Sequence, residues 1–490
     1  MTEKPFERLA KGSYFLSLSS IVNMGMGALF WFILARMVEP AYVGQAMVVI
    51  ALITSVIGFS GIGVQAMTSK YISECNARRM PGLSRKVFSV GMKVAILVSG
   101  TAALSIGLLS ENIATAAYKD PGMAILLAFA AFTYLPAHTI VMALIGVFQG
   151  SQRMEYVLFI NLLFQLVRLS SAAALVLYGL SSFGILTGFA LGSSVAASIA
   201  YFYLTPKMLP KQIEGSLRLR DLLKFSGFNY IDAGVRSVAG QIAVLLLGTY
   251  NFELAAFFGV TALISKIMSS VIGGVSSAIL PTASEEWAKG NKHEFGHIFN
   301  AAVRIPLVIT GFAVLVLMIA PNAVLSLIGK SYVEASAALR ILVISSLIVA
   351  LDSIMLSLLN ATGRSGLVAR IGLVSSAVTI VLTVILIPLF RLEGAAVALL
   401  VGSISSLILS ATLLKYREGL SLRGSSVIKP AVSIIAGLLI GILMLGLLNN
   451  PLLAIITAIA TYCGFSLVSH AIKMSEVKKL LGILLHTAKI

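Results

Sequence analysis

Charge is scarce in this sequence, and the scarcity excludes most kinds of soluble protein. Only 11% of the 490 residues are charged, whereas 58% are hydrophobic and the mean hydropathy is +0.99. A soluble domain has roughly a quarter of its residues charged, so this chain cannot keep a surface that faces water on all sides. The composition therefore predicts a membrane protein.

Motifs for metal binding and catalysis are scarce as well. Cys75 and Cys463 are the only cysteines, which excludes a disulfide framework and a cysteine-rich zinc site. Gly329-Lys330-Ser331 resembles the end of a phosphate-binding loop, but Val324 stands where that motif requires its first glycine. The connecting segments are short and carry few carboxylates, so we expect neither an enzyme nor a cofactor.

Long hydrophobic runs fill most of the chain. A helix needs roughly 20 apolar residues to cross a bilayer core of about 30 Å, and about 14 segments meet this requirement. They predict an all-α polytopic membrane protein. The predicted spans are 13–36, 42–67, 88–111, 122–149, 156–178, 182–204, 225–249, 253–280, 297–320, 335–360, 366–389, 393–415, 428–448 and 451–473.

The two ends of the chain differ from these spans. The first run has no small-residue cleavage site, so we interpret it as an uncleaved span rather than a signal peptide. The tail 474–490 is too short to cross a membrane. Its leucines and lysines are arranged as in an amphipathic segment that lies on the membrane surface.

Lysine and arginine are distributed unevenly between the alternate loops. With the amino terminus inside, 25 of them fall on the inner side and 4 on the outer side, the latter being Arg36, Lys119, Lys330 and Arg391. Cytoplasmic loops carry such an excess. We therefore expect an inner (plasma) membrane protein with both termini in the cytoplasm. The net charge of +17 then indicates contact with anionic lipids, not nucleic acid.

A basic linker divides the spans into two groups. Segment 205–224 contains Pro206, Pro210 and Gly215 and separates six predicted helices from the other eight. A shift of 215 residues aligns the tetrapeptide that begins at Ser55 with an identical one at Ser270. These features predict two six-helix lobes, 1–204 and 225–415, related by a parallel pseudo-twofold repeat, with 428–473 as an added helix pair. A central cavity is expected between the lobes.

Three basic residues lie close to the centres of predicted spans, namely Arg168, Arg236 and Lys266. A charge there costs roughly 2.5–3.5 kcal/mol on insertion scales, so each must face a cavity or a partner. Polar residues accompany two of them at helical spacing. Asn161 and Gln165 share a face with Arg168, and Asn229 and Asp232 share a face with Arg236.

Two interpretations of these charges remain open. In the first, the three residues line a cationic cavity that binds an anionic ligand. Arginine suits this role because it binds phosphate in a bidentate manner. Alternatively, they are buried structural partners, with Asp232 and Arg236 neutralising each other. Asp352 is a further acid near the centre of a span and is either a coupling site or an ion-pair partner. His138 is more typical of helix packing than of a proton relay.

Four short stretches carry a resemblance to a known family. They are Ile33–Gly44, Gly150–Tyr156, Asn360–Gly363 and Ile387–Ala396. In their order and spacing they resemble polysaccharide exporters of the multidrug/oligosaccharidyl-lipid/polysaccharide (MOP) superfamily, and the similarity covers essentially the whole chain. One departure is Ala243, near which many relatives carry an acid.

The resemblance implies a Wzx-type flippase. Such proteins carry a lipid-linked oligosaccharide from the cytoplasmic to the outer leaflet, and a positively charged lumen accepts the polyprenyl phosphate or diphosphate. Such a lumen agrees with Arg236, Lys266 and Arg168, which the cost of their charges already indicates as candidates for substrate contact. We also expect such a protein to work alongside glycan assembly enzymes. The alternative within the superfamily is a cation-coupled multidrug antiporter, which relies on cavity acids.

Overall fold

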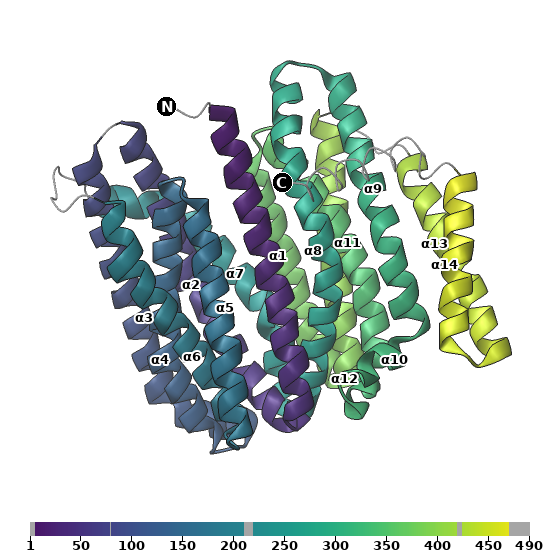
Figure 1. Ribbon diagram of the computed structural model, residues 1–490, viewed down its shortest axis with the longest axis horizontal. Helices are drawn as coiled ribbons and strands as arrows, with labels where there is room; N and C mark the ends of the chain where they lie inside the picture. Colours follow the sequence, from purple (N-terminus) through teal and green to yellow (C-terminus); the bar gives the residue numbers. More distant parts are fainter. Residues whose placement is uncertain (1–4, 79, 210–218, 419–423, 470–490) are drawn as a thin grey trace. The chain divides into compact units, whose positions relative to one another are not determined.

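The computed structural model describes residues 5–78, 80–209, 219–418 and 424–469, and these residues form helices joined by short turns without any strand (Figure 1). The predicted all-α fold is confirmed. The elements are α1 (Pro5–Met37), α2 (Pro40–Ala77), α3 (Pro81–Tyr118), α4 (Met123–Gly150), α5 (Met154–Leu177), α6 (Ser181–Ile199), η1 (Ala200–Leu204), η2 (Thr205–Lys207), α7 (Leu219–Tyr250), α8 (Phe252–Ala288), α9 (Lys292–Ile319), α10 (Pro321–Ser326), η3 (Lys330–Ala335), α11 (Ser336–Ala361), α12 (Ser365–Glu418), α13 (Gly424–Leu448) and α14 (Pro451–Val468).

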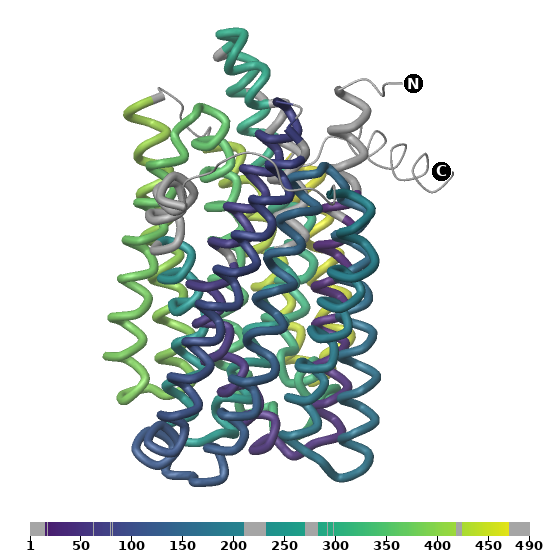
Figure 2. Tube along the Cα trace, turned by 90° about the vertical axis from the view of Figure 1, so that its left-hand side faces the viewer, coloured from purple at the N-terminus to yellow at the C-terminus, as the bar shows by residue number. Residues whose placement is uncertain are grey.

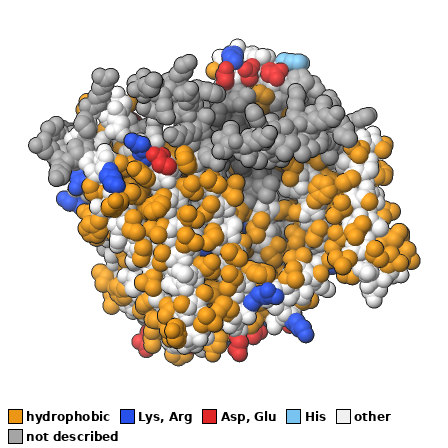
Figure 3. Space-filling view, in the orientation of Figure 1, with side chains coloured by type: hydrophobic (Ala, Val, Ile, Leu, Met, Phe, Trp, Pro, Cys, Tyr) orange, Lys and Arg blue, Asp and Glu red, His pale blue; other side chains and the backbone are white. Residues whose placement is uncertain are grey.

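The number of membrane crossings agrees with the prediction. Within the described ranges, 13 helical segments are long and apolar enough to span a bilayer. One of them, Ser365–Arg417, is broken at Arg391, whose φ of 49° and ψ of −117° are not helical. It therefore supplies two of the predicted spans. The face drawn in Figure 3 has a broad hydrophobic band with charged side chains near its edges, as a multi-pass membrane protein requires.

The four stretches that carry the family resemblance all lie at helix ends. Ile33–Gly44 contains the turn from α1 to α2, and Asn360–Gly363 ends α11 with Gly363 at a φ of 78°. At the break in α12, a side chain on Gly394 would collide with the backbone of Leu386. The motif residues therefore serve mainly to join spans through very short connections.

The packing of the described helices defines two compact units. One comprises Met1–Leu263 with Ser376–Ala395, and the other comprises Ile264–Ser375 with Ala396–Ile490. These units are defined by contacts rather than by sequence repeats. The two predicted lobes and their pseudo-twofold relation stay a prediction, and so does the surface role of the tail 474–490, which lies outside the described residues. Part of the predicted linker 205–224, namely 210–218, also lies outside the described residues.

The first unit depends on close approach between helices. α2 packs against α4 and α7, and α5 packs against α6. Between α2 and α7, a side chain on Gly58 would collide with Ser237, and one on Gly248 would collide with Val48. Ser237 Oγ also donates a hydrogen bond of 3.0 Å to the carbonyl oxygen of Thr54. Small residues allow the two backbones to approach in this way.

The second unit has an apolar core in which α9 and α11 meet. Phe295 and Phe299 of α9 are buried there with Met355 and Leu358 of α11. The 37-residue helix α8 is about 55 Å long, well beyond the bilayer core. Its last turn and the start of α9 extend past the other helix ends of this unit (Figures 1 and 2).

Candidate functional site

The predicted polar face of α5 lies against α1, within the first unit. Asn161 Nδ2 donates a hydrogen bond of 2.7 Å to Ser19 Oγ. One turn further, Gln165 Nε2 donates to the carbonyl oxygen of Asn23 at 3.0 Å and to its side-chain oxygen at 3.1 Å. The spacing therefore placed these side chains on one face correctly, and the structure identifies the helix that this face meets.

Arg168 continues this face and lies inside an aromatic cage. Its guanidinium carbon is 4.1 Å from the ring centroid of Phe30, 4.7 Å from that of Phe189 and 5.3 Å from that of Phe164. The residue is only 6% exposed. A desolvated cation over an aromatic ring gains about 2 kcal/mol, so three rings offset a large part of the cost of burying this charge.

The guanidinium has unused hydrogen-bonding capacity. Among the described residues, Arg168 Nε and Nη2 are buried without any hydrogen-bond partner, and so is Gln165 Oε1. Arginine remains charged under all ordinary conditions. The aromatic cage thus holds a permanent cation that the described residues do not neutralise with an acid.

A glycine repeat in α6 brings the cage together. Gly184, Gly188 and Gly192 recur every four residues and face α5. A side chain on Gly188 would come within 2.6 Å of Ala172 Cβ and 2.8 Å of the Arg168 carbonyl oxygen. This close approach carries the ring of Phe189, next to Gly188, over the guanidinium. Sequence reasoning missed the cage, although the glycine repeat was a signal for tight α5–α6 packing.

His138 lies beside the cage in α4 and has a packing role. Its Nδ1 is 3.2 Å from Ser193 Oγ of α6, and its ring centroid is 5.5 Å from that of Phe164. The residue joins α4 to two cage helices, which agrees with the packing interpretation.

Arg236 forms an ion pair on its own helix. Its Nε is 2.8 Å from Asp232 Oδ1, and the two side chains are 37% and 20% exposed. The pair lies on α7 in the first unit, and Arg236 makes further contacts. The side chain of Asn229 lies outside those described. Arg236 is therefore paired with an acid of its own helix and remains partly accessible, while its contact with a substrate stays a prediction.

Lys266 and Asp352 lie in the second unit. Lys266, near the middle of α8, is exposed and forms no ion pair with any residue that the structure describes. Asp352 of α11 is only 7% exposed. It accepts hydrogen bonds from Ser406 at 2.6 Å and Ser410 at 2.7 Å, so these hydroxyls fix its position.

The candidate residues therefore fall into separate groups. The structure brings Asn161, Gln165 and Arg168 together and pairs Asp232 with Arg236. Within the described ranges, no three histidine, cysteine or acidic residues gather as metal ligands would.

Comparison with known proteins assigns the chain to a family. A family model described as polysaccharide biosynthesis protein matches residues 9–287, more than half of the chain. The chain belongs to this family. It is also 24% identical over 221 residues to an uncharacterized membrane protein of Methanocaldococcus jannaschii, a match that spans 43% of each protein. The chain thus matches less than half the length of this curated relative.

Several solved structures with a similar fold are described as transporters or flippases. The lipid II flippase MurJ, in an inward closed conformation, has a TM-score of 0.72 at 14% identity, covering 92% of this chain and 98% of that one. An inward-facing multidrug resistance MATE transporter of the MOP superfamily has a TM-score of 0.69 at 13% identity, covering 83% and 97%. A Pyrococcus furiosus MOP transporter, described as having a binding pocket of reverse polarity, has a TM-score of 0.62 at 14% identity, covering 86% and 99%. The chain therefore has the MOP fold.

Proposed function

We propose that this protein is a flippase that moves a polyprenyl-(di)phosphate-linked oligosaccharide from the cytoplasmic to the outer leaflet. It belongs to a polysaccharide biosynthesis family and has a transporter fold. Glycans are assembled on lipid carriers whose phosphate groups are anionic and whose sugars cannot cross a bilayer unaided. Such a substrate needs a polar route through the membrane with positive charge along it.

The exposed lysine at position 266 is the observation that carries this proposal. A lysine near the middle of a spanning helix costs roughly 2.5–3.5 kcal/mol if it faces lipid. Lys266 is nevertheless exposed and has no acidic partner among the described residues. An ammonium in that position is stable when it borders a water-filled route, where it is able to bind the carrier phosphate.

The other candidate residues support this role in different ways. Arg236 is accessible for phosphate contact, with Asp232 holding its side chain in place. Arg168 is too deeply buried for direct contact in this conformation, so it contributes mainly through its charge. Asn161 and Gln165 would bind sugar or phosphate groups only when α1 moves away from α5. Asn229 remains a proposed contact.

The seam between α2 and α7 supports alternating access. It involves Thr54, Gly58, Ser237 and Gly248, and by the positive-inside assignment α2 begins and α7 ends at the outer surface. The seam would close the outer side of the route while substrate enters from the cytoplasm. We expect it to separate when the protein opens outward.

The same reasoning places the protein in its cellular setting. Both termini are proposed to be cytoplasmic and the chain to lie in the inner (plasma) membrane, because of the bias of basic loops. Its partners would be anionic lipids and the enzymes that build the glycan.

A cation-coupled drug antiporter is the second candidate function. The observation that favours it is Asp352, a buried carboxylate with two serine donors that is able to bind a proton or a small cation. The exposed Lys266 is unfavourable for cationic cargo, so the flippase is the better-supported proposal.

Translocation of a fluorescent polyprenyl-diphosphate oligosaccharide in proteoliposomes tests the function directly. We expect Lys266→Gln to reduce the rate at least about tenfold, since one lost charge-assisted contact is worth about 1.5–3 kcal/mol, and Lys266→Arg to retain most of it. Lys93→Gln is a matched control, because Lys93 is an exposed lysine near the predicted cytoplasmic end of its span. Full activity of Lys266→Gln at normal yield would contradict the mechanism, whereas uptake of organic cations without glycan translocation would favour the antiporter.

A further inference from the structure

The aromatic cage of the first unit has the geometry of a binding site for an organic cation. Phe30, Phe164 and Phe189 present their rings to one point from three helices, at 4.1–5.3 Å from the guanidinium carbon. Aromatic cages of this kind recognise quaternary ammonium and guanidinium groups in ligands. Here the group inside the cage belongs to the protein itself.

We infer that Arg168 is a tethered occupant of this cage and determines specificity by keeping organic cations out of the first unit. The residue is 6% exposed, and its guanidinium fills the space among the rings. The described residues provide no acid against it, so the positive charge remains to repel a second cation. Two features thus oppose cationic ligands, namely lack of space and electrostatic repulsion.

This role explains the unusual composition of the cage. A structural arginine is normally satisfied by carboxylates or carbonyls, but Arg168 Nε and Nη2 have no hydrogen-bond partner among the described residues. Its environment is provided by ring faces, which bind the charge while leaving the donors unused. Removing the side chain should therefore leave an intact cage that accepts a free cation of the same shape.

The test is the binding of N-ethylguanidinium to the purified Arg168→Ala protein. This ligand carries the atoms that the substitution removes, and N-ethylurea is a neutral ligand of similar size. Trp31 is a natural reporter, since its ring centroid is 5.1 Å from that of Phe30 and 6.3 Å from that of Phe189. The other tryptophan, Trp287, is changed to Phe in all proteins compared.

For Arg168→Ala, we expect N-ethylguanidinium to cause a saturable change in Trp31 fluorescence, with a dissociation constant on the order of 1 mM. Wild type and Arg168→Lys, which keep a tethered cation, should bind at least about tenfold more weakly. Adding Phe189→Leu to Arg168→Ala should weaken binding several-fold. The inference would be overturned if wild type bound N-ethylguanidinium as tightly as Arg168→Ala does. It would also be overturned if Arg168→Ala bound N-ethylurea as tightly as N-ethylguanidinium.

A second measurement applies if Arg168→Ala does not accumulate as folded protein. Membranes are then prepared and extracted with N-ethylguanidinium at about ten times the expected dissociation constant, on the order of 10 mM. A rise in detergent-stable yield with this cation and not with N-ethylurea supports the tethered-occupant role, and no rise contradicts it. The assay contains no lipid-linked substrate, so its result is independent of the proposed flippase activity.

Discussion

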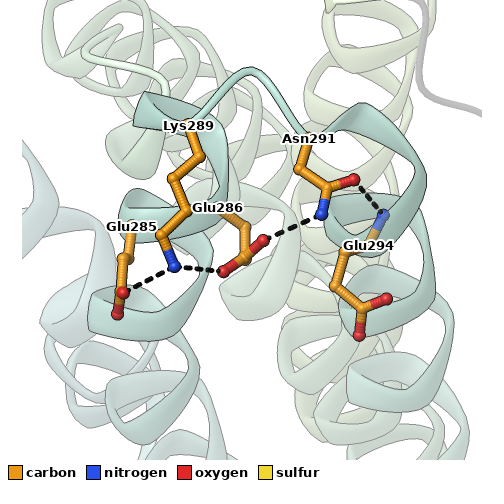
Figure 4. Close-up of polar contacts among 5 residues, drawn as sticks. All are labelled: Glu285, Glu286, Lys289, Asn291 and Glu294. Carbon is orange, nitrogen blue, oxygen red and sulfur yellow. Dashed lines mark hydrogen bonds and ion pairs between the residues drawn. The ribbon is translucent and has the colours of Figure 1, made fainter.

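The turn between α8 and α9 shows how single side chains organise a helix end. Figure 4 shows Glu286 between two donors, with Lys289 Nζ at 2.9 Å and Asn291 Nδ2 at 3.1 Å from its two oxygens. Lys289 also lies 2.7 Å from Glu285. Asn291 is the N-cap of α9, where its side-chain oxygen accepts from the backbone N–H of Glu294. The turn is therefore held by a small network of charges and one cap.

The pKa of Glu286 should reveal this network. The hydrogen bond from Lys289 lowers the pKa of Glu286 below its ordinary value of 4.5. Because the folded pKa is depressed, the stabilisation is present at neutral pH and is lost as the pH falls below 4.5, through the lowered pKa. We expect Lys289→Met to raise the pKa of Glu286, as measured by NMR titration of its side-chain carboxyl carbon. If the pKa of Glu286 were the same in Lys289→Met as in wild type, Lys289 would not stabilise this carboxylate.

Replacing the cap tests the start of α9. Asn291→Ala should cost about 1 kcal/mol of local stability, because the N–H of Glu294 loses its acceptor. Hydrogen exchange of the first turn of α9 should then accelerate about fivefold, while Asn291→Ser, another good cap, should leave it nearly unchanged. Equal exchange in all three proteins would contradict the capping role.

Helix packing in the first unit depends on glycine at particular positions. α6 approaches α5 through Gly184, Gly188 and Gly192, and a single added carbon at Gly188 would already collide with Ala172. By contrast, Gly100 in α3 has open space around it. An added side chain would therefore disrupt packing at Gly188 but would be tolerated at Gly100, although both glycines lie in helices of the first unit.

Substitution of these glycines gives a direct comparison. Gly188→Ala should destabilise the protein by about 1–3 kcal/mol, because α6 must move away from α5. Gly100→Ala should be neutral or slightly stabilising, since alanine favours helix by up to about 1 kcal/mol. Thermal unfolding in detergent distinguishes the two. A similar melting temperature for both variants would show that the α5–α6 contact is looser than the structure indicates.

The sequence predicted which residues share one face of a helix better than it predicted which helix packs against that face. The spacing of Asn161, Gln165 and Arg168 fixed one face of α5, and the structure confirms that face. Spacing contains no information on which helix lies opposite, so the contact with α1 and the cage around Arg168 could not be derived. The motif around Pro388 marked the turn within α12, because a break there is a local property. Lys266 was found by the cost of its charge, and its ligand stays a proposal.

At the scale of the whole molecule, the proposed alternating access requires the α2–α7 seam to open and close. A disulfide between Val48→Cys and Gly248→Cys, in a background without Cys75 and Cys463, should form readily because these positions are in contact. We expect it to stop translocation almost completely and a reducing agent to restore it. Gly25→Cys with Gly240→Cys is the control, since neither glycine has a neighbour within 4 Å. Undiminished transport by the cross-linked protein would exclude a moving seam.

The driving force of transport also belongs to this scale. If Asp352 binds the coupling ion, Asp352→Asn should abolish the dependence of translocation on a proton or sodium gradient while the protein remains folded, because asparagine preserves the shape and one acceptor for Ser406. Flux measured with and without each gradient decides this. A loss of folded protein without any change in gradient dependence would assign Asp352 a structural role.

The aromatic cage also has a consequence for biogenesis. Helices enter the membrane in chain order, so α5 leaves the translocon with Arg168 before α6 has been made. At that moment Phe30 and Phe164 are present, but Phe189 is not, and the cage around the guanidinium is incomplete. A charged helix that lacks its full set of partners inserts less favourably. A nascent chain that ends after α5 should therefore remain longer at the translocon than one that includes α6, which makes α6 the element that releases α5 into the lipid.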